Sequence, residues 1–155
     1  MVKRVHHIGI AVKNLKESVP LFEKLLGIKA EIHEAQSQRV TEACFKLGDE
    51  AEIDLLEPMG EDSTVAKFLE KRGEGLHHIA LEVENINDGL KAMENQGIQL
   101  IDKAGREGVA GQIGFLHPKS TGGVLIELIE PKEKKGKKQD HNTVFFNKFV
   151  TKDRD

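Results

Sequence analysis

The sequence of 155 residues has one cysteine, no apolar run long enough to cross a membrane, and no overall excess of positive charge. Cys44 alone cannot form an internal disulfide, which favours a reducing, cytoplasmic location. A transmembrane helix needs roughly 18 or more consecutive apolar residues, so we expect no membrane partner. Strand-like sequence begins at Val5, so we also expect no signal or transit peptide.

The charge is distributed unevenly along the chain. Residues 1–131 carry 15 Lys and Arg against 22 Asp and Glu, a net charge of −7. Residues 132–155 carry 8 against 4, a net charge of +4. The acidic body argues against nucleic acid as a partner. Its length fits a single domain over residues 1–131, and the composition of residues 132–155 predicts a basic, flexible tail.

The most informative feature of the sequence is an internal repeat. The segment His6–Leu15, His-His-Ile-Gly-Ile-Ala-Val-Lys-Asn-Leu, returns 71 residues later as His-His-Ile-Ala-Leu-Glu-Val-Glu-Asn-Ile. The segment Ile53–Pro58, Ile-Asp-Leu-Leu-Glu-Pro, returns 73 residues later as Ile-Glu-Leu-Ile-Glu-Pro. The repeat therefore preserves a histidine near its start and a carboxylate near its end, as well as an apolar pattern.

Each copy of the repeat predicts a strand, a helix and three further strands. The fold class is therefore α+β, with tandem βαβββ modules at about 4–58 and 76–131 and a linking helix at about 63–72. We expect strands at 4–12, 28–35, 39–47, 51–57, 76–84, 98–102, 111–116 and 123–130, and helices at 14–26 and 86–96. Pro20 conflicts with a helix capped at Asn14, so that helix begins near Ser18 or is kinked at Pro20.

Alternation along the first strand of each module assigns its side chains to two faces. His7 lies opposite the large apolar residues, and a small residue, Gly9, follows it on the same face. His78 has the same setting in the second module. We therefore expect His7 and His78 to point into a cleft, and their neighbours His6 and His77 to point away from it.

The last strand of each module adds a carboxylate to the cleft face. Asp54 and Glu127 fall on this face by the same alternation, so two imidazoles and two carboxylates converge. Nitrogen and oxygen ligands without a thiolate suit Co²⁺, Mn²⁺, Ni²⁺, Fe²⁺ or Zn²⁺. Such an ion can polarise a carbonyl group and stabilise an enolate, which is Lewis-acid catalysis.

The third strand of the first module places Glu42 and Cys44 on the cleft face. Glu42 is the predicted general base, because burial raises a carboxyl pKa toward the neutral range that proton abstraction requires. Aligning Phe45 with Phe115 puts Gln112 on the wall opposite Glu42. We identify no group that would activate Cys44 as a nucleophile.

At these residues the chain resembles the methylmalonyl-CoA epimerases of the vicinal oxygen chelate (glyoxalase) superfamily. The most specific segments are Asp62–Ala80, which ends in Gly-Leu-His-His-Ile-Ala, and Leu116–Leu128, which contains His-Pro-Lys-Ser. The resemblance covers residues 5–131. It implies an open mixed-sheet cleft and a homodimer. It also implies an isomerase of propionate metabolism that interconverts (2R)- and (2S)-methylmalonyl-CoA.

The resemblance also implies roles for individual residues. The implied metal ligands are His7, Asp54, His78 and Glu127, with Co²⁺ as the expected ion and Mn²⁺, Ni²⁺ or Zn²⁺ as alternatives. The implied acid and base groups are Glu42 and Glu127. Relatives commonly carry Glu or Gln where this chain has Asp54, which is one methylene shorter, so Glu52 on the same face is the alternative ligand. The expected substrate contacts are Gln112, Lys119 and Ser120.

Two other functions stay open at this point. A glyoxalase-type lyase or isomerase would use the same metal ligands on a glutathione hemithioacetal. A non-catalytic binding protein of the same fold would be expected to lack those ligands. A CoA thioester is strongly anionic, so local basic groups must bind it; Arg39, Arg106, Lys119 and the tail are the candidates.

Overall fold

The computed structural model describes residues 1–132, so the predicted tail lies outside the described residues apart from Lys132. The elements are, in chain order, β1 Arg4–Ala11, α1 Leu15–Leu26, β2 Glu31–Ala35, η1 Gln36–Gln38, β3 Val40–Lys46, β4 Glu52–Pro58, α2 Thr64–Arg72, β5 Gly75–Glu82, α3 Ile86–Asn95, β6 Arg106–Glu107, β7 Gly111–Leu116, η2 Pro118–Ser120 and β8 Ile126–Pro131. None of the described helices combines the length and the apolar character that a membrane span needs.

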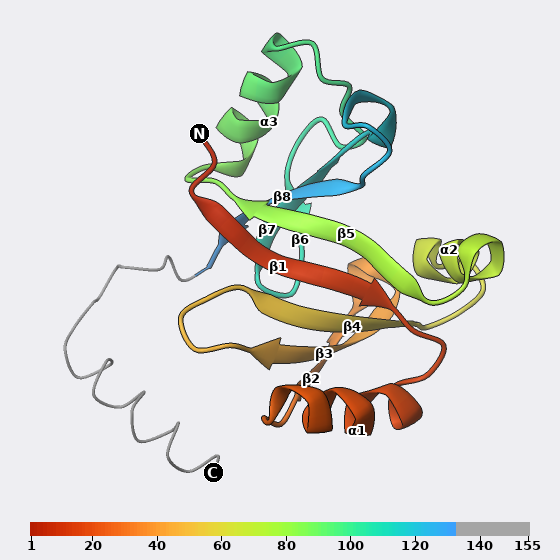
Figure 1. The fold of residues 1–155 in the computed structure, drawn as a ribbon. Coiled ribbons are helices and arrows are strands. Elements are labelled where there is room, and N and C mark those ends of the chain that lie inside the picture. Colours follow the sequence, from red (N-terminus) through yellow and green to blue (C-terminus); the bar gives the residue numbers. More distant parts are fainter. Residues whose placement is uncertain (133–155) are drawn as a thin grey trace.

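The eight described strands form one mixed sheet in the order β2-β3-β4-β1-β5-β8-β7-β6. Within each module the first and last strands are parallel neighbours, β1 with β4 and β5 with β8. The two modules join through the antiparallel pair β1–β5 at the centre of the sheet (Figure 1). This topology confirms the predicted α+β fold of two tandem βαβββ modules.

The core of each module lies between its helix and one face of the sheet. Under α1 the buried residues are Val12, Leu15, Ala43, Phe45 and Leu55. Under α3 they are Val83, Ile86, Leu90, Leu116 and Leu128. These are the helix-facing positions of the alternating strand pattern, so the opposite face of the strands is available to line a cleft.

Helix α1 begins at Leu15 and contains Pro20. The side-chain oxygen of Asn14 accepts a hydrogen bond from a backbone N–H of the first turn at 3.0 Å, as an N-cap residue does. The helix ends at Gly27, whose φ of 74° is favourable only for glycine. The alternative start near Ser18 is therefore wrong, because Asn14 caps the helix and its first residue is Leu15.

The repeated Glu-Pro pair has a structural explanation. Glu57 at the end of β4 accepts a hydrogen bond from the backbone N–H of Leu15 at 2.6 Å. Glu130 at the end of β8 accepts one from Ile86 at 2.9 Å. A carboxylate beside free N–H groups at a helix N-terminus is favourable. Each module thus ties its last strand to the start of its own helix.

The predicted strand at 98–102 is wrong. Leu100 forms only an isolated bridge with Leu116, and the edge strand is β6 instead. The carboxylate of Asp102 accepts a hydrogen bond from the backbone N–H of Phe115 at 2.8 Å. A side-chain carboxylate therefore accepts the hydrogen bond that a backbone carbonyl of a neighbouring strand would otherwise accept. The alternation of apolar residues in the sequence cannot reveal such a replacement.

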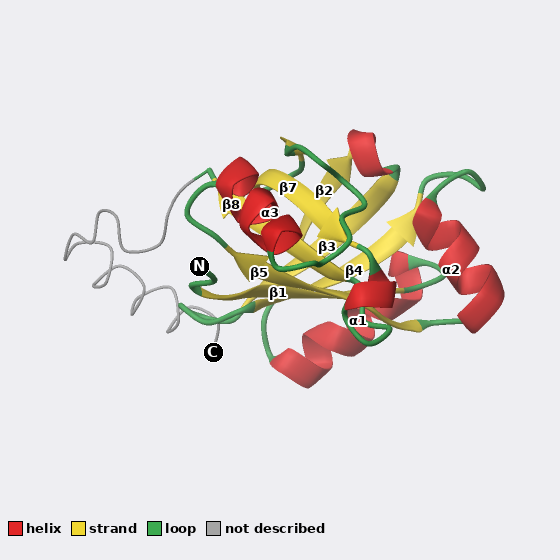
Figure 2. Cartoon of the chain, turned by 90° about the horizontal axis from the view of Figure 1, so that it is seen from above, coloured by secondary structure: helices red, strands yellow, loops and turns green. Residues whose placement is uncertain are grey.

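The sheet curls until its two edges meet (Figure 2). The hydroxyl of Ser37, in the turn after β2, donates a hydrogen bond to the backbone carbonyl of Glu107 in β6 at 2.8 Å. Val109, in the turn after β6, packs against a buried cluster of the first module. The concave face is thereby closed into cavities rather than left as a flat surface.

Candidate metal centre and active site

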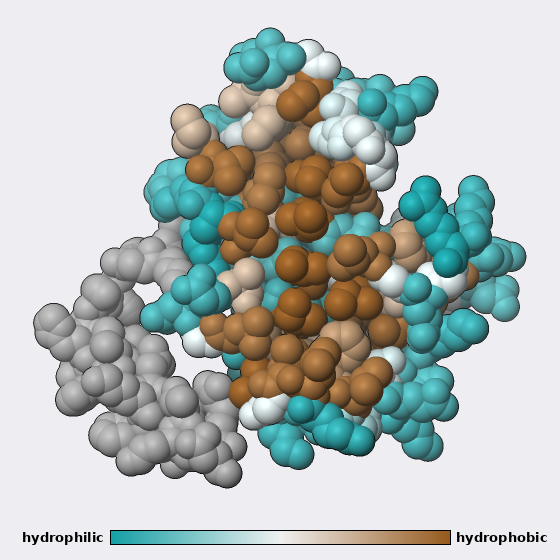
Figure 3. All heavy atoms as spheres, viewed as in Figure 1, coloured by the Kyte–Doolittle hydropathy of each residue, from teal (hydrophilic) through white to brown (hydrophobic). Residues whose placement is uncertain are grey.

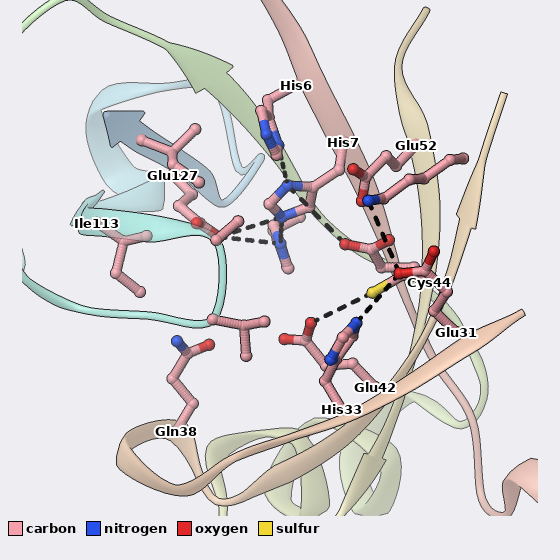
Figure 4. Close-up of a pocket in the computed structure, with 16 residues that line it drawn as sticks. His6, His7, Glu31, His33, Gln38, Glu42, Cys44, Glu52, Ile113 and Glu127 are labelled. Carbon is pink, nitrogen blue, oxygen red and sulfur yellow. Dashed lines mark hydrogen bonds and ion pairs between the residues drawn. The ribbon is translucent and has the colours of Figure 1, made fainter. Parts of the chain in front are cut away.

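Three predicted metal ligands converge at the centre of the concave face. Nε2 of His7 on β1 lies 3.0 Å from Nε2 of His78 on β5. Oε1 of Glu127 on β8 lies 3.0 Å from Nε2 of His78 and 3.6 Å from Nε2 of His7. Figure 4 shows His7 and Glu127 pointing toward one another. All three residues are at least nine-tenths buried.

The spacing and chemistry of this group fit a divalent ion. Ligand atoms about 2.0–2.2 Å from one ion lie roughly 3.0–3.5 Å apart at neighbouring coordination positions. Two imidazole nitrogens and a carboxylate oxygen are ordinary ligands for first-row divalent metals. Among the described residues, His7, His78 and Glu127 form one of two clusters that could hold a metal ion.

The outer histidine of each His-His pair orients the inner one. Nδ1 of His6 lies 2.8 Å from Nδ1 of His7, and Nδ1 of His77 lies 3.0 Å from Nδ1 of His78. These contacts leave Nε2 of both inner rings toward the cluster, and such partners fix the tautomer and ring orientation of a metal ligand. Sequence alternation missed this role of the first histidine in each repeat.

The expectation that His6 points away from the cleft is wrong. His6 is buried and lines the same cavity as His7 (Figure 4). The pairing of β1 with β5 has a register shift between Val5 and His7. A β-bulge interrupts strict alternation at that point, so neighbouring side chains can approach one cavity.

Asp54 lies beside His7, His78 and Glu127, but its carboxylate is near a different nitrogen of the His7 ring. Its Oδ2 is 3.9 Å from Nδ1 of His7, whereas the other two predicted ligands contact Nε2 of that ring. Its carboxylate instead clusters with Glu42 and Cys44, with ligand atoms within 4.8 Å of one another. The Oδ1 atom is buried and has no hydrogen-bond partner among the described residues.

The group of three opens into a cavity of about 210 Å³. The lining includes the polar side chains of Glu42 and Cys44 on β3 (Figure 4) and of Asp54 on β4. It also includes the apolar side chains of Ile113 and Ile129. Glu42, the predicted base, therefore borders the same space as the candidate metal centre.

The repeat alignment used for Gln112 is wrong by one residue. Phe115 pairs with Glu127 between β7 and β8, and Cys44 holds the same place opposite Asp54 between β3 and β4. The repeat counterpart of Phe115 is therefore Cys44 and not Phe45. The match between Phe45 and Phe115 in the sequence did not predict how β3 pairs with β4 or how β7 pairs with β8.

The corrected register changes the wall opposite Glu42. Its repeat counterpart is Ile113, which is buried and lines the cavity. Gln112 is exposed and lines neither of the two cavities considered among the described residues. Sequence alternation had the right strand for this wall but the wrong face.

Lys119 and Ser120 lie in η2, outside both of these cavities. The hydroxyl oxygen of Ser120 accepts a hydrogen bond from the backbone N–H of Gln99 at 2.9 Å. Both residues are exposed. Their expected contact with substrate stays a prediction.

A second cavity of about 200 Å³ adjoins the first, and both are lined by Gln38 and His78. Its lining includes Arg39 and Arg106, two of the basic groups that the sequence offered for an anionic substrate. Arg39 has a φ of 57°, a strained value for a side chain other than glycine. Strain of this kind is more common at functional sites than elsewhere.

Burial and mutual charge shift the acidities in the metal-free cluster. Burial disfavours charge on His7, but the carboxylates led by Glu127 outweigh it and raise the pKa of His7 to about 9. Burial raises the pKa of Glu42, and it raises the pKa of Asp54 to about 8. Burial opposes charge on Glu127, but the adjacent imidazoles hold its pKa below the usual range.

Two carboxyls of the same cavity therefore differ in acidity. Glu42 is shifted toward holding its proton, while Glu127 is shifted toward losing it. Opposite shifts of this kind separate groups that take up a proton from groups that stay charged. Burial also raises the pKa of the Cys44 thiol, which argues against a nucleophilic cysteine in the metal-free site.

Residues 6–117 match the family model of the glyoxalase/bleomycin resistance protein/dioxygenase superfamily. The chain belongs to this superfamily. The match spans both His-His pairs and most of both modules, so it confirms the resemblance suggested by the sequence.

Two individual proteins of known sequence are similar to this chain over most of its length. The chain is 42% identical over 134 residues to the uncharacterized protein YqjC of Bacillus subtilis, covering 84% of this chain and 94% of that protein. It is 36% identical over 130 residues to human mitochondrial methylmalonyl-CoA epimerase, covering 81% of this chain and 72% of that protein.

A solved structure extends the comparison to the fold. It is a variant of Streptomyces coelicolor methylmalonyl-CoA epimerase in complex with 2-nitronate-propionyl-CoA. Its TM-score to this chain is 0.81 at 32% sequence identity, covering 88% of this chain and 99% of the other. The comparisons therefore support the epimerase family within the superfamily.

Proposed function

We propose that this chain is an epimerase that interconverts (2R)- and (2S)-methylmalonyl-CoA with the help of a divalent metal ion. The observation that carries the proposal is the shared cavity: a buried carboxyl, Glu42, borders the same space as the metal-binding group of His7, His78 and Glu127. Relatives with the same fold are methylmalonyl-CoA epimerases, which supports this substrate.

The proposed metal ligands are His7, His78 and Glu127, with Asp54 as the fourth. Co²⁺ is the ion we propose first, and Mn²⁺, Ni²⁺ and Zn²⁺ suit the same nitrogen and oxygen atoms. When bound, the ion would act as a Lewis acid for charge that develops on the thioester oxygen of the substrate. His6 and His77 hold the two imidazole rings in the required orientation.

Inversion at C2 requires proton transfer on both faces of that carbon. One of Glu42 and Glu127 removes the C2 proton, and the other delivers a proton to the opposite face. A single group would return the proton to the side from which it came. Burial raises the pKa of Glu42 above the usual value of a carboxyl group, which suits a group that takes up a proton. The apolar wall at Ile113 and Ile129 limits water around the reacting carbon.

The anionic substrate needs cationic partners beyond the metal. We propose that Arg39 and Arg106, which line the cavity next to the catalytic one, bind anionic groups of the CoA thioester. Both guanidinium groups now contact carboxylates, Asp62 at 3.3 Å and Asp102 at 3.1 Å. Substrate binding would therefore compete with an exposed ion pair at Arg39, which is individually weak, and with a partly buried one at Arg106.

We also propose a homodimer formed through the convex face of the sheet. Figure 3 shows an apolar band on this face, over the region of β1, β5 and α1. Val5, Leu76, Leu21 and Leu25 from these elements are 41–69% exposed. Contiguous apolar surface on a soluble protein marks an interaction site, and a second copy would cover it.

The test of the proposed reaction is deuterium wash-in at C2. Methylmalonyl-CoA is incubated in heavy water with the metal-depleted protein, with and without added Co²⁺, and both label at C2 and configuration are followed. Metal-dependent exchange with inversion is the expected result. Glu42→Gln should slow inversion by about 10²–10⁴-fold, the usual contribution of a general acid or base.

Glu31→Gln is the matched control, since Glu31 lines the same cavity and has no proposed role as acid, base or metal ligand. It should retain most of the activity. Near-normal inversion by Glu42→Gln would show that the base is misassigned. Turnover of the methylglyoxal–glutathione adduct, with no exchange in methylmalonyl-CoA, would replace the proposal with a glyoxalase-type reaction.

A further inference from the structure

The second cluster of metal-binding groups has a composition different from the first. Glu42, Cys44 and Asp54 place a carboxylate oxygen, a thiol sulfur and a second carboxylate oxygen within 4.8 Å of one another. The thiol of Cys44 donates to Oε1 of Glu42 at 3.7 Å, and Cys44 pairs with Asp54 across the β3–β4 ladder. All three residues are nine-tenths or more buried.

One atom of this cluster lacks the partner that burial demands. Oδ1 of Asp54 is inaccessible to solvent and accepts no hydrogen bond from any described residue. A buried carboxyl oxygen without a hydrogen-bond partner is unfavourable. A cation beside Asp54 would satisfy this oxygen, and the neighbouring thiol and carboxylate supply the other ligands.

We infer that Glu42, Cys44 and Asp54 form a second, inhibitory binding site for a soft divalent cation such as Zn²⁺ or Cd²⁺. A thiolate selects softer ions than imidazole and carboxylate do, so the two clusters differ in metal preference. Three protein ligands with a fourth position left for water make a common tetrahedral arrangement. On binding, the S–H bond of Cys44 breaks, a bond between sulfur and the ion forms, and the protons of the thiol and of any protonated carboxyl ligand leave to solvent.

The surroundings offset the charge of this site. A thiolate and two carboxylates exceed the charge of a divalent ion by one. Lys46 and His33 line the same cavity, and both lie on the strands β2 and β3 beside the cluster. Lys46 is only loosely engaged, with its ammonium 3.7 Å from the carboxylate of Glu31, so it is available to compensate the excess negative charge.

Inhibition follows from the identity of the ligands, and this step rests on the proposed function. A Glu42 carboxylate that ligates a cation cannot accept the C2 proton. The same ion would also withdraw Asp54 from the neighbouring metal centre. Harder ions such as Mn²⁺ lack affinity for the thiolate and would leave Glu42 free.

Binding can be tested without any activity measurement. Cys44 is the only cysteine of the chain, so every thiolate-to-metal signal reports on it. The metal-depleted full chain is titrated with Cd²⁺, and the sulfur-to-cadmium charge-transfer absorption is followed together with proton release. We expect saturation with one thiolate per chain, and no absorption in Cys44→Ser, which keeps a hydrogen-bond donor toward Glu42.

The carboxylate variants decide whether the cluster, rather than a lone thiol, binds the ion. Asp54→Asn and Glu42→Gln should each weaken Cd²⁺ binding by at least about tenfold. If Asp54→Asn does not fold, as judged by circular dichroism, the test of the carboxylate ligands rests on Glu42→Gln. Unchanged affinity in the folded carboxylate variants, or no absorption in the wild type, would overturn the inference.

Two further arms separate this site from the proposed function. His78→Ala removes an imidazole of the first cluster and should keep the cadmium absorption; its loss would assign the ion to that cluster instead. In the Co²⁺-loaded enzyme, the concentration of Zn²⁺ or Cd²⁺ that inhibits the wild type should be at least about tenfold lower than the concentration that inhibits Cys44→Ser. Failure of the epimerase assay would leave the absorption measurements intact as a test of the site.

Discussion

Gly9 fixes the position of His78, and substituting it by alanine should damage the metal centre more than the fold. An ideal Cβ at residue 9 would lie 2.3 Å from Cε1, 2.6 Å from Nδ1 and 2.9 Å from Nε2 of His78. The backbone of Gly9 is not in the left-handed region, so alanine adopts it without strain. The three atoms nearest to the added Cβ all belong to the imidazole ring of His78.

The size of the displacement follows from these distances. Non-bonded carbon atoms prefer a separation of about 3.5–4.0 Å, so the ring of His78 must move by roughly 1 Å. Metal–ligand distances tolerate only about 0.2 Å. We expect metal affinity to fall by about 10–100-fold, and turnover by about 10² if Nε2 of His78 positions the reacting centre.

Isothermal titration with Co²⁺ and the deuterium wash-in assay measure the two effects. Gly114→Ala is the matched control, because its Cβ would lie 2.8 Å from Cδ1 of Leu90 in the core under α3. That variant should lower the melting temperature and leave metal affinity unchanged. Wild-type metal affinity in a folded Gly9→Ala protein would refute the assignment of His78 as a ligand held by this contact.

Three further predictions concern pH, assembly and helix capping. The folded, metal-free chain holds protons on His7 and Asp54 up to pKa values of about 9 and 8, against 6.5 and 3.8 when unfolded. Each of these two groups contributes stability that is complete below its pKa in the unfolded chain. That stability is lost as the pH rises through its pKa in the folded chain, so the melting temperature should fall from pH 6.5 to 9. Added Co²⁺ should raise the melting temperature more at pH 9 than at pH 6.5. A melting temperature that rises with pH in the metal-free chain would contradict the pKa shifts of His7 and Asp54. If the chain forms the proposed dimer, Leu76→Glu should convert it to monomer in analytical ultracentrifugation, and an unchanged dimer would place the interface elsewhere. Glu57→Ala and Glu130→Ala should each lower the free energy of unfolding in urea by about 1 kcal/mol, as cap losses do; no loss in either would rule out the capping role.

The duplication made most of the fold predictable from the sequence. Two copies of the same apolar pattern gave the element order, and Asn14 and Gly27 marked the ends of α1 through specific capping chemistry. The errors arose where a side chain replaced the backbone as a hydrogen-bond partner, as Asp102 does for Phe115. They also arose at the bulge beside His6, because alternation assumes an uninterrupted ladder.

The candidate site was predictable to the extent that it is symmetric. His7, His78 and Glu127 follow from alternation within single strands, which needs no knowledge of how strands pair. Gln112 was misplaced because its position depended on an alignment between two strands of different modules. Only the ladder register shows that Ile113 is the counterpart of Glu42.

The corrected register shows that Glu42 and Cys44 have no polar counterparts in the second module. At equivalent positions of the two modules, β3 carries Glu42 and Cys44 where β7 carries Ile113 and Phe115. The shared ancestry of the modules accounts for a metal centre at their junction, because each contributes an equivalent histidine. Their divergence places a thiol beside the proposed base, so the wall that permits catalysis is also the wall that a soft cation can block.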